Sequence, residues 1–224
     1  MDSRSGLRLA CVTVCTVLAG PGVAAANGGL SVTVTGATGA AIEGAVVIAE
    51  PLPGAGHPRA AQKVAIMDQH NLMFVPEVLI VQTGTAVDFP NSDQVRHQVY
   101  SFSPAKKFEL ALYAGRAHAP VVFDKAGLVT LGCNIHDNML GYIWVTDSPW
   151  FGHSDAQGAV QLHDLAPGDY TVHIWHALLN ESGPELAQRV TVSDNQQVAA
   201  SFRLRRALRA PTHNHGTDKQ WADY

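Results

Sequence analysis

The amino-acid sequence predicts an all-β protein whose central part folds as a Greek-key sandwich or barrel. Glycine and proline are frequent, at 20 and 12 of the 224 residues. Short Val- and Thr-rich segments of alternating polarity also recur, as expected for strands separated by turns. About eight such segments fall within residues 62–147, a close spacing typical of Greek-key β folds. No segment carries the periodicity of a helix of useful length.

Two strands are expected before this central block and several after it. In residues 30–34 apolar side chains alternate with Ser and Thr, the pattern of a half-buried strand, and residues 44–48 form the second strand. Pro and Gly interrupt residues 51–58, which we expect to be a connector. After Pro149 the sequence again shows short strand-like segments separated by turns, as it does before the central block. Strands are expected there at residues 160–162, 170–175, 190–192 and 198–204.

The expected strands of the central block are short and separated by recognisable turns. Gly84 and the segments 91–93 and 125–127 supply turn-forming residues. The strands cover residues 63–67, 75–82, 86–89, 98–102, 108–112, 121–123, 128–131 and 141–145.

The first 26 residues have the composition of a secretory signal peptide. Arg4 and Arg8 give a positive start, residues 9–18 are apolar, and residues 24–26 are small. A membrane anchor is the rival interpretation, but the apolar segment is too short to span a bilayer. We therefore expect a periplasmic or secreted protein with no membrane span. A charged fraction of 15% and a net charge of −4 argue against nucleic acid as a partner.

Export changes what the cysteines can do. Cys11 and Cys15 lie within the predicted signal peptide, so the mature chain keeps Cys133 alone. In an oxidising compartment a lone cysteine is a free thiol, an intermolecular link or a metal ligand.

Cys133 belongs to the most informative motif of the chain. Cys133, His136 and Met139 fall within seven residues, between a strand ending at 131 and one starting at 141, and His97 stands at the head of an earlier strand. Two histidines, one cysteine and a distant methionine form the donor set of a blue-copper site. Zinc is the competing metal, but structural zinc sites are usually richer in cysteine. Taken singly, each side chain would be interpreted as core or backbone support; their combination predicts copper.

These residues resemble those of cupredoxins. Residues 74–145 are similar to a plastocyanin/azurin-type domain, and the short ligand loop is similar in length to that of amicyanin. More narrowly, Met67-Asp-Gln, Phe89-Pro-Asn-Ser-Asp, His97-Gln-Val-Tyr-Ser-Phe-Ser and Gly132-Cys-Asn-Ile-His resemble exported cupredoxin-like proteins often labelled methylamine utilization proteins. The resemblance implies one mononuclear type 1 copper site, with His97, Cys133 and His136 as strong ligands and Met139 as the weak axial one. Two departures bear on its colour and potential: Asn134-Ile135 stand between Cys133 and His136, and Gln98 follows the first histidine where asparagine is usual.

The flanking segments resemble a different family, the carboxypeptidase-regulatory or transthyretin-like sandwich. The resemblance rests on Gly44-Ala-Val-Val, Asp155-Ala-Gln-Gly and Leu165-Ala-Pro-Gly-Asp-Tyr. It implies that the cupredoxin domain is inserted into a loop of a second small sandwich, which is possible where the ends of the inserted domain lie close together. The expected division is a signal peptide at 1–26, a split sandwich at 27–58 and 150–204, a cupredoxin domain at 62–147 and a disordered tail at 205–224.

The function expected from these residues is electron transfer rather than catalysis. The chain shows no nucleophile–base–acid motif, no phosphate-binding glycine loop and no paired-carboxylate motif, so we expect no enzyme activity. A redox protein such as a c-type cytochrome or a periplasmic dehydrogenase is the expected partner. Two alternatives remain open: a copper-binding or copper-delivery protein without a role in electron transfer, and a metal-free β-sandwich interaction module.

Overall fold

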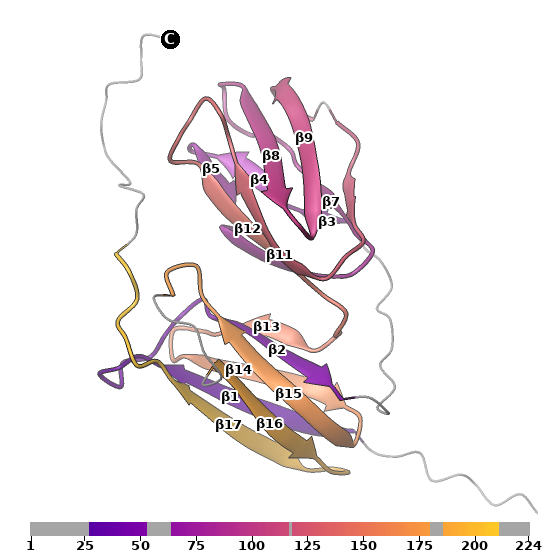
Figure 1. Ribbon diagram of the computed structural model, residues 1–224, viewed down its shortest axis with the longest axis vertical. Coiled ribbons are helices and arrows are strands. Elements are labelled where there is room, and N and C mark those ends of the chain that lie inside the picture. The colour runs from indigo at the N-terminus through magenta and orange to yellow at the C-terminus, as the bar shows by residue number, and fades with distance from the viewer. Residues whose placement is uncertain (1–26, 53–63, 117, 180–185, 211–224) are drawn as a thin grey trace, which may run out of the picture.

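The computed structural model describes residues 27–52, 64–116, 118–179 and 186–210 (Figure 1). Every named element in these ranges is a β-strand, so the predicted all-β class is confirmed. The predicted signal peptide lies outside the described residues, as do 53–58 of the predicted connector and 211–224 of the predicted tail. Within the described ranges, no helix has the length and apolar character needed to cross a membrane.

Strands from both ends of the described chain form two facing sheets, drawn in the lower half of Figure 1. One sheet has the order β14-β1-β17 and the other β13-β2-β15-β16. Strand β1 pairs with β14 in antiparallel and with β17 in parallel orientation. The strands are β1 (Gly28–Thr35), β2 (Val46–Pro51), β13 (Phe151–His153), β14 (Ala159–Leu165), β15 (Gly168–Trp175), β16 (Ala187–Val192) and β17 (Gln197–Arg203).

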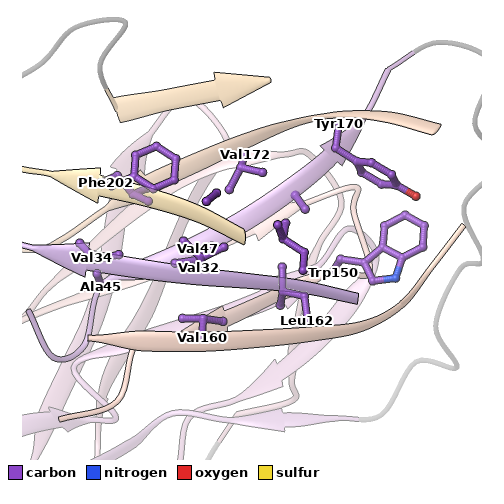
Figure 2. Packing of buried hydrophobic residues seen from close by; sticks show 14 of the residues in the cluster. Val32, Val34, Ala45, Val47, Trp150, Val160, Leu162, Tyr170, Val172 and Phe202 are labelled. Carbon is purple, nitrogen blue, oxygen red and sulfur yellow. The ribbon is translucent and has the colours of Figure 1, made fainter. Parts of the chain in front are cut away.

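The core of these two sheets follows from the alternation seen in the sequence. In β1, Leu30, Val32 and Val34 are buried because alternate side chains of a strand point to the same face. Figure 2 shows Val32 and Val34 packed with side chains from the opposite sheet, among them Val47 and Val172, and Leu30 belongs to the same core cluster. The rings of Trp150 and Tyr170 meet edge to face at the end of this core.

The middle of the chain forms the second β region, drawn in the upper half of Figure 1. Its largest sheet has the order β6-β12-β11-β8-β9, and a smaller sheet has the order β10-β7-β3. Strands β4 and β5 form a hairpin. The strands are β3 (Ala65–Ile66), β4 (Asp68–His70), β5 (Met73–Val75), β6 (Val78–Gln82), β7 (Thr85–Asp88), β8 (His97–Ser103), β9 (Lys106–Tyr113), β10 (Val121–Phe123), β11 (Gly127–Gly132) and β12 (Leu140–Thr146).

Strand β2 joins the two regions because it is buried on both faces. Val47 and Ala49 face the core of the flanking sheets, whereas Val46 and Ile48 pack in a separate cluster with Ile80 of β6. Partly buried side chains extend this second cluster: Val78, Trp144, Phe151 and Trp175. Burial on both faces explains why the first four residues of β2, from Val46 to Ala49, are all apolar instead of alternating, whereas Glu50 beyond them is exposed.

Three details differ from the sequence-based expectation. The strand predicted at 75–82 is divided into β5 and β6, with Pro76, which has no backbone N–H to donate, between them. Strands β4 and β13 were not expected. In the predicted disordered tail, residues 205–210 are placed. The Arg209 amide donates a hydrogen bond to the Leu178 carbonyl at 2.8 Å, and Leu208 packs against the flanking core.

Candidate metal centre

The predicted ligands lie at one end of the five-stranded sheet. Strand β8 begins with His97, and Cys133 directly follows the end of β11. Because β8 and β11 are antiparallel neighbours, the start of one lies beside the end of the other. The short loop from Cys133 to Met139 then leads into β12, which pairs with β11 along its whole length. Sheet topology therefore positions the loop and His97 at the same place.

Three side chains converge there. The Nδ1 atoms of His97 and His136 lie 3.1 Å apart, and the Cys133 Sγ lies 3.8 Å from His136 Nδ1. Potential ligand atoms of all three residues lie within 4.8 Å of one another. His97 and Cys133 are buried, at 0% and 4% exposure, while His136 is half-buried. Among the residues that the structure describes, no other group of three His, Cys, Asp or Glu side chains is close enough to hold a metal ion.

Met139, the fourth predicted ligand, lies at the inner end of the same loop. Its side chain is 2% exposed and belongs to the core cluster that also contains Cys133. Its backbone N–H donates to the His136 carbonyl at 2.9 Å, which closes a tight turn between the two residues. The loop therefore turns Cys133 and Met139 into the core, while His136 stays close to the surface.

The surroundings of Cys133 favour its thiolate. Burial alone raises the pKa of this thiol, but hydrogen bonds from His97, from the backbone N–H groups of Gln98 and Ile135, and from His136 lower it from 9.0 to about 6. The thiolate, which is the form that binds metals, therefore predominates at neutral pH. Burial lowers the pKa of His97, but hydrogen bonds to Cys133 and Asp93 outweigh that effect and raise it.

Asp93 is the functional residue that sequence reasoning missed. Its Oδ2 lies 2.8 Å from Nε2 of His97, on the side of the ring away from Cys133 and His136. The sequence places Asp93 four residues before His97, in a segment that was interpreted as a turn and as part of the family resemblance but not as part of the metal site. That spacing was the available signal, because histidine ligands commonly donate their second ring N–H to a carboxylate.

The two departures from the cupredoxin pattern contact each other. The Asn134 amide donates to Gln98 Oε1 at 2.8 Å, and the Gln98 amide donates to Glu109 Oε1 at 2.5 Å. Gln98 and Glu109 lie on β8 and β9, whereas Asn134 lies on the ligand loop. We call these three residues the loop clamp, because they tie the loop across the surface of the sheet.

A buried polar network supports the strands next to His97. Tyr113, the cross-strand partner of His97, donates its hydroxyl proton to the Phe89 carbonyl at 2.6 Å and accepts from the Gln69 amide at 2.5 Å. Asn91 donates to the Tyr113 carbonyl at 2.9 Å. Burial raises the pKa of Tyr113 to about 12, so the phenol remains protonated and holds this arrangement in place.

No family model matches the sequence, and no curated protein matches it. Among solved structures, a purple cupredoxin from Nitrosopumilus maritimus is similar over 37% of this chain and 99% of its own, with a TM-score of 0.33 and 22% identity. A copper-containing nitrite reductase from Thermus scotoductus SA-01 is similar over 43% of this chain and only 25% of its own, with a TM-score of 0.36 and 23% identity. A reduced amicyanin variant is similar over 44% of this chain and 98% of its own, with a TM-score of 0.34 and 19% identity. At such TM-scores these similarities do not support a functional assignment. The choice of metal depends on the side chains of the site.

Proposed function

We propose that this protein is a type 1 copper protein of the cupredoxin kind that carries single electrons between redox partners. The observation that carries the proposal is the convergence of His97, Cys133 and His136 within 4.8 Å. Met139, buried in the same core cluster as Cys133, completes the donor set.

The side chains present fit a mononuclear copper ion. Soft sulfur donors favour Cu(I), imidazole accepts both oxidation states, and this combination of donors is that of blue-copper sites. Structural zinc sites are usually richer in cysteine than this one. His97 and His136 would bind through their facing Nδ1 atoms, Cys133 through Sγ, and Met139 as the weak donor. Bound copper would supply a one-electron couple between Cu(I) and Cu(II).

The unequal burial of the donors suits electron exchange with a docked protein. His97 and Cys133 are shielded from water, whereas His136 is half-buried and its neighbour Ile135 is 51% exposed. A small apolar surface allows brief docking without strong affinity. We place electron entry and exit at His136, with a c-type cytochrome or a periplasmic dehydrogenase as the partner.

The wider assignment follows the sequence. We propose an exported protein, periplasmic or secreted, of the type labelled methylamine utilization proteins, with no substrate chemistry of its own. We also propose that residues 62–147 are a cupredoxin domain inserted into a carboxypeptidase-regulatory-like sandwich of residues 27–58 and 150–204. The pairing of β1 with both β14 and β17 supports this division, because it joins segments from before and after the central region in one sheet.

The test is a visible and paramagnetic-resonance spectrum of the purified mature protein after addition of one equivalent of Cu(II). We expect the intense thiolate-to-copper absorption, and we expect Cys133→Ser to abolish it. Asp137→Asn, an exposed change in the same loop, is the matched control and should keep the band. The same band in the Cys133→Ser protein would exclude the assignment.

A competing chelator separates the carrier from a copper-delivery protein. An electron carrier keeps its copper in both oxidation states, because each turnover returns the ion to the same donors. Rapid loss of copper to the chelator, together with an intact spectrum before its addition, would favour delivery instead.

A further inference from the structure

We propose that Asp93 is a positioning residue of the copper centre, which fixes the ring of His97 for binding and lowers the reduction potential through its negative charge. This inference rests on the proposed function.

The carboxylate of Asp93 is held by three donors from two parts of the chain. Oδ2 accepts from His97 Nε2 at 2.8 Å and from the Leu72 amide at 3.0 Å, and Oδ1 accepts from the Asn71 amide at 2.7 Å. Asn71 and Leu72 form the turn between β4 and β5, and both have left-handed backbone conformations, with φ of 54° and 59°. The carboxylate is therefore held in place before any metal binds.

This arrangement selects which nitrogen of His97 is free. A neutral imidazole carries one ring proton, and the contact with a carboxylate places that proton on Nε2. When the ring is neutral, as a metal ligand must be, the atom left unprotonated is Nδ1, which lies 3.1 Å from His136 Nδ1 at the proposed site. Without Asp93, Nε2 would lose the hydrogen-bond acceptor that favours this tautomer.

The negative charge acts on the two oxidation states unequally. A fixed carboxylate one imidazole away stabilises Cu(II) more than Cu(I), because the oxidised ion carries the larger charge. Screening by water is small here, since His97 is fully buried and the Asp93 side chain is only 12% exposed. His70 also faces this carboxylate, but at 3.9 Å and with its side chain 55% exposed.

The experiment compares Asp93→Asn with Asp68→Asn in the full mature protein. Asp68 is also an aspartate near the same turn, but its carboxylate accepts hydrogen bonds from Ser92 Oγ and from the backbone N–H of Gln69 rather than from a proposed ligand. Removing the carboxylate partner of a ligand typically costs 10–100-fold in metal affinity. We expect Asp93→Asn to lose Cu(II) affinity in this range and to lose less of its Cu(I) affinity. Each tenfold loss of Cu(II) affinity relative to Cu(I) affinity raises the reduction potential by about 59 mV. Asp68→Asn should leave the potential close to that of the wild type.

Further readouts keep the proposal testable if Asp93→Asn folds poorly. In the metal-free wild-type protein, nitrogen-15 NMR should show a slowly exchanging proton on His97 Nε2, and Asp93→Glu should restore most of the wild-type potential. A neutral His97 that carries its single ring proton on Nδ1, or equal potentials for Asp93→Asn and Asp68→Asn, would overturn the proposal. A wild-type protein that gives no thiolate-to-copper band would instead refute the proposed function, while the NMR measurement would still decide the role of Asp93.

Discussion

At the scale of single residues, the candidate centre shows how burial and hydrogen bonding act in opposite directions on one thiol. Cys133 is 4% exposed, and burial by itself would keep it protonated. Two backbone N–H groups and two imidazoles aimed at the sulfur reverse that preference. These donors reach the sulfur because Cys133 lies beside the start of β8 and at the beginning of a tight loop. The pKa of the thiol therefore depends on where the strands end.

The first prediction concerns the thiol of Cys133 in the metal-free protein. Its ultraviolet thiolate absorbance should titrate with a pKa of about 6 instead of 9.0. Because the folded-state pKa is depressed, the thiolate contributes stability that is complete above about pH 9 and lost as the pH falls through about 6. Denaturation of wild type and Cys133→Ser across this range would measure that contribution. A titration near 9 in the folded protein would show that the donors do not reach the sulfur.

The second prediction concerns Met139. Met139→Leu should keep copper bound and raise the reduction potential, because loss of a weak donor destabilises Cu(II) more than Cu(I). The exchange conserves volume, so unfolding should become easier by less than about 1.5 kcal/mol. Voltammetry of the copper-loaded variant is the measurement. A potential equal to that of the wild type would mean that Met139 only fills the core.

At the scale of elements, the sequence predicts contacts between adjacent strands better than contacts between distant turns. The convergence of Cys133, His136 and Met139 followed from a short loop joining neighbouring strands. Asp93 was missed although it stands only four residues before His97, because its carboxylate is oriented by Asn71 and Leu72, which lie 22 and 21 residues away in the chain. A local sequence pattern cannot predict the contact of the Asp93 carboxylate with the β4–β5 turn, because only the packing of that turn creates it.

The loop clamp shows a similar limit. Gln98 and Asn134 were both recognised as departures from the usual pattern, but not as partners, since 36 residues separate them. The break between β5 and β6 was also missed, although Pro76 was visible in the sequence. The apolar residues that follow Pro76 favoured the prediction of one continuous strand. The burial of Ile80 and Val81 shows why these residues are apolar.

The third prediction tests the clamp. Asn134→Ala should speed the release of copper to a chelator about two- to threefold and leave the thiolate-to-copper band in place, because the loop loses one hydrogen bond to β8. Hydrogen bonds of this kind contribute about 0.5–1.5 kcal/mol, and exposure puts this one at the lower end. Asn138→Ala, another exposed asparagine of the same loop, is the matched control. Equal release rates for the two variants would show that the clamp does not hold the loop.

At the scale of the whole molecule, an apolar contact attaches the region of the candidate metal centre to the flanking sheets. Three buried residues, Val46, Ile48 and Ile80, form the centre of the contact. Around them, the ring of Trp175 on β15 lies 5.2 Å from that of Tyr142 and 5.5 Å from that of Trp144. Tyr142 and Trp144 belong to β12, the strand that follows the ligand loop, so the strand leading out of the centre also forms the contact with the flanking sheets.

The last prediction follows from this arrangement. In wild-type protein, urea unfolding monitored by copper absorbance and by far-ultraviolet circular dichroism should give coincident transitions, because a shared apolar cluster couples the two regions. Trp175→Ala removes the ring that spans the contact and should cost about 2–4 kcal/mol, near the lower end for tryptophan because its side chain is only partly buried. The two probes should then separate while the copper spectrum of the folded variant stays unchanged. Phe102→Ala, at an aromatic side chain that is 78% exposed, is the control and should leave the transitions coincident. Separate transitions already in the wild type would show that the two regions unfold independently despite their contact.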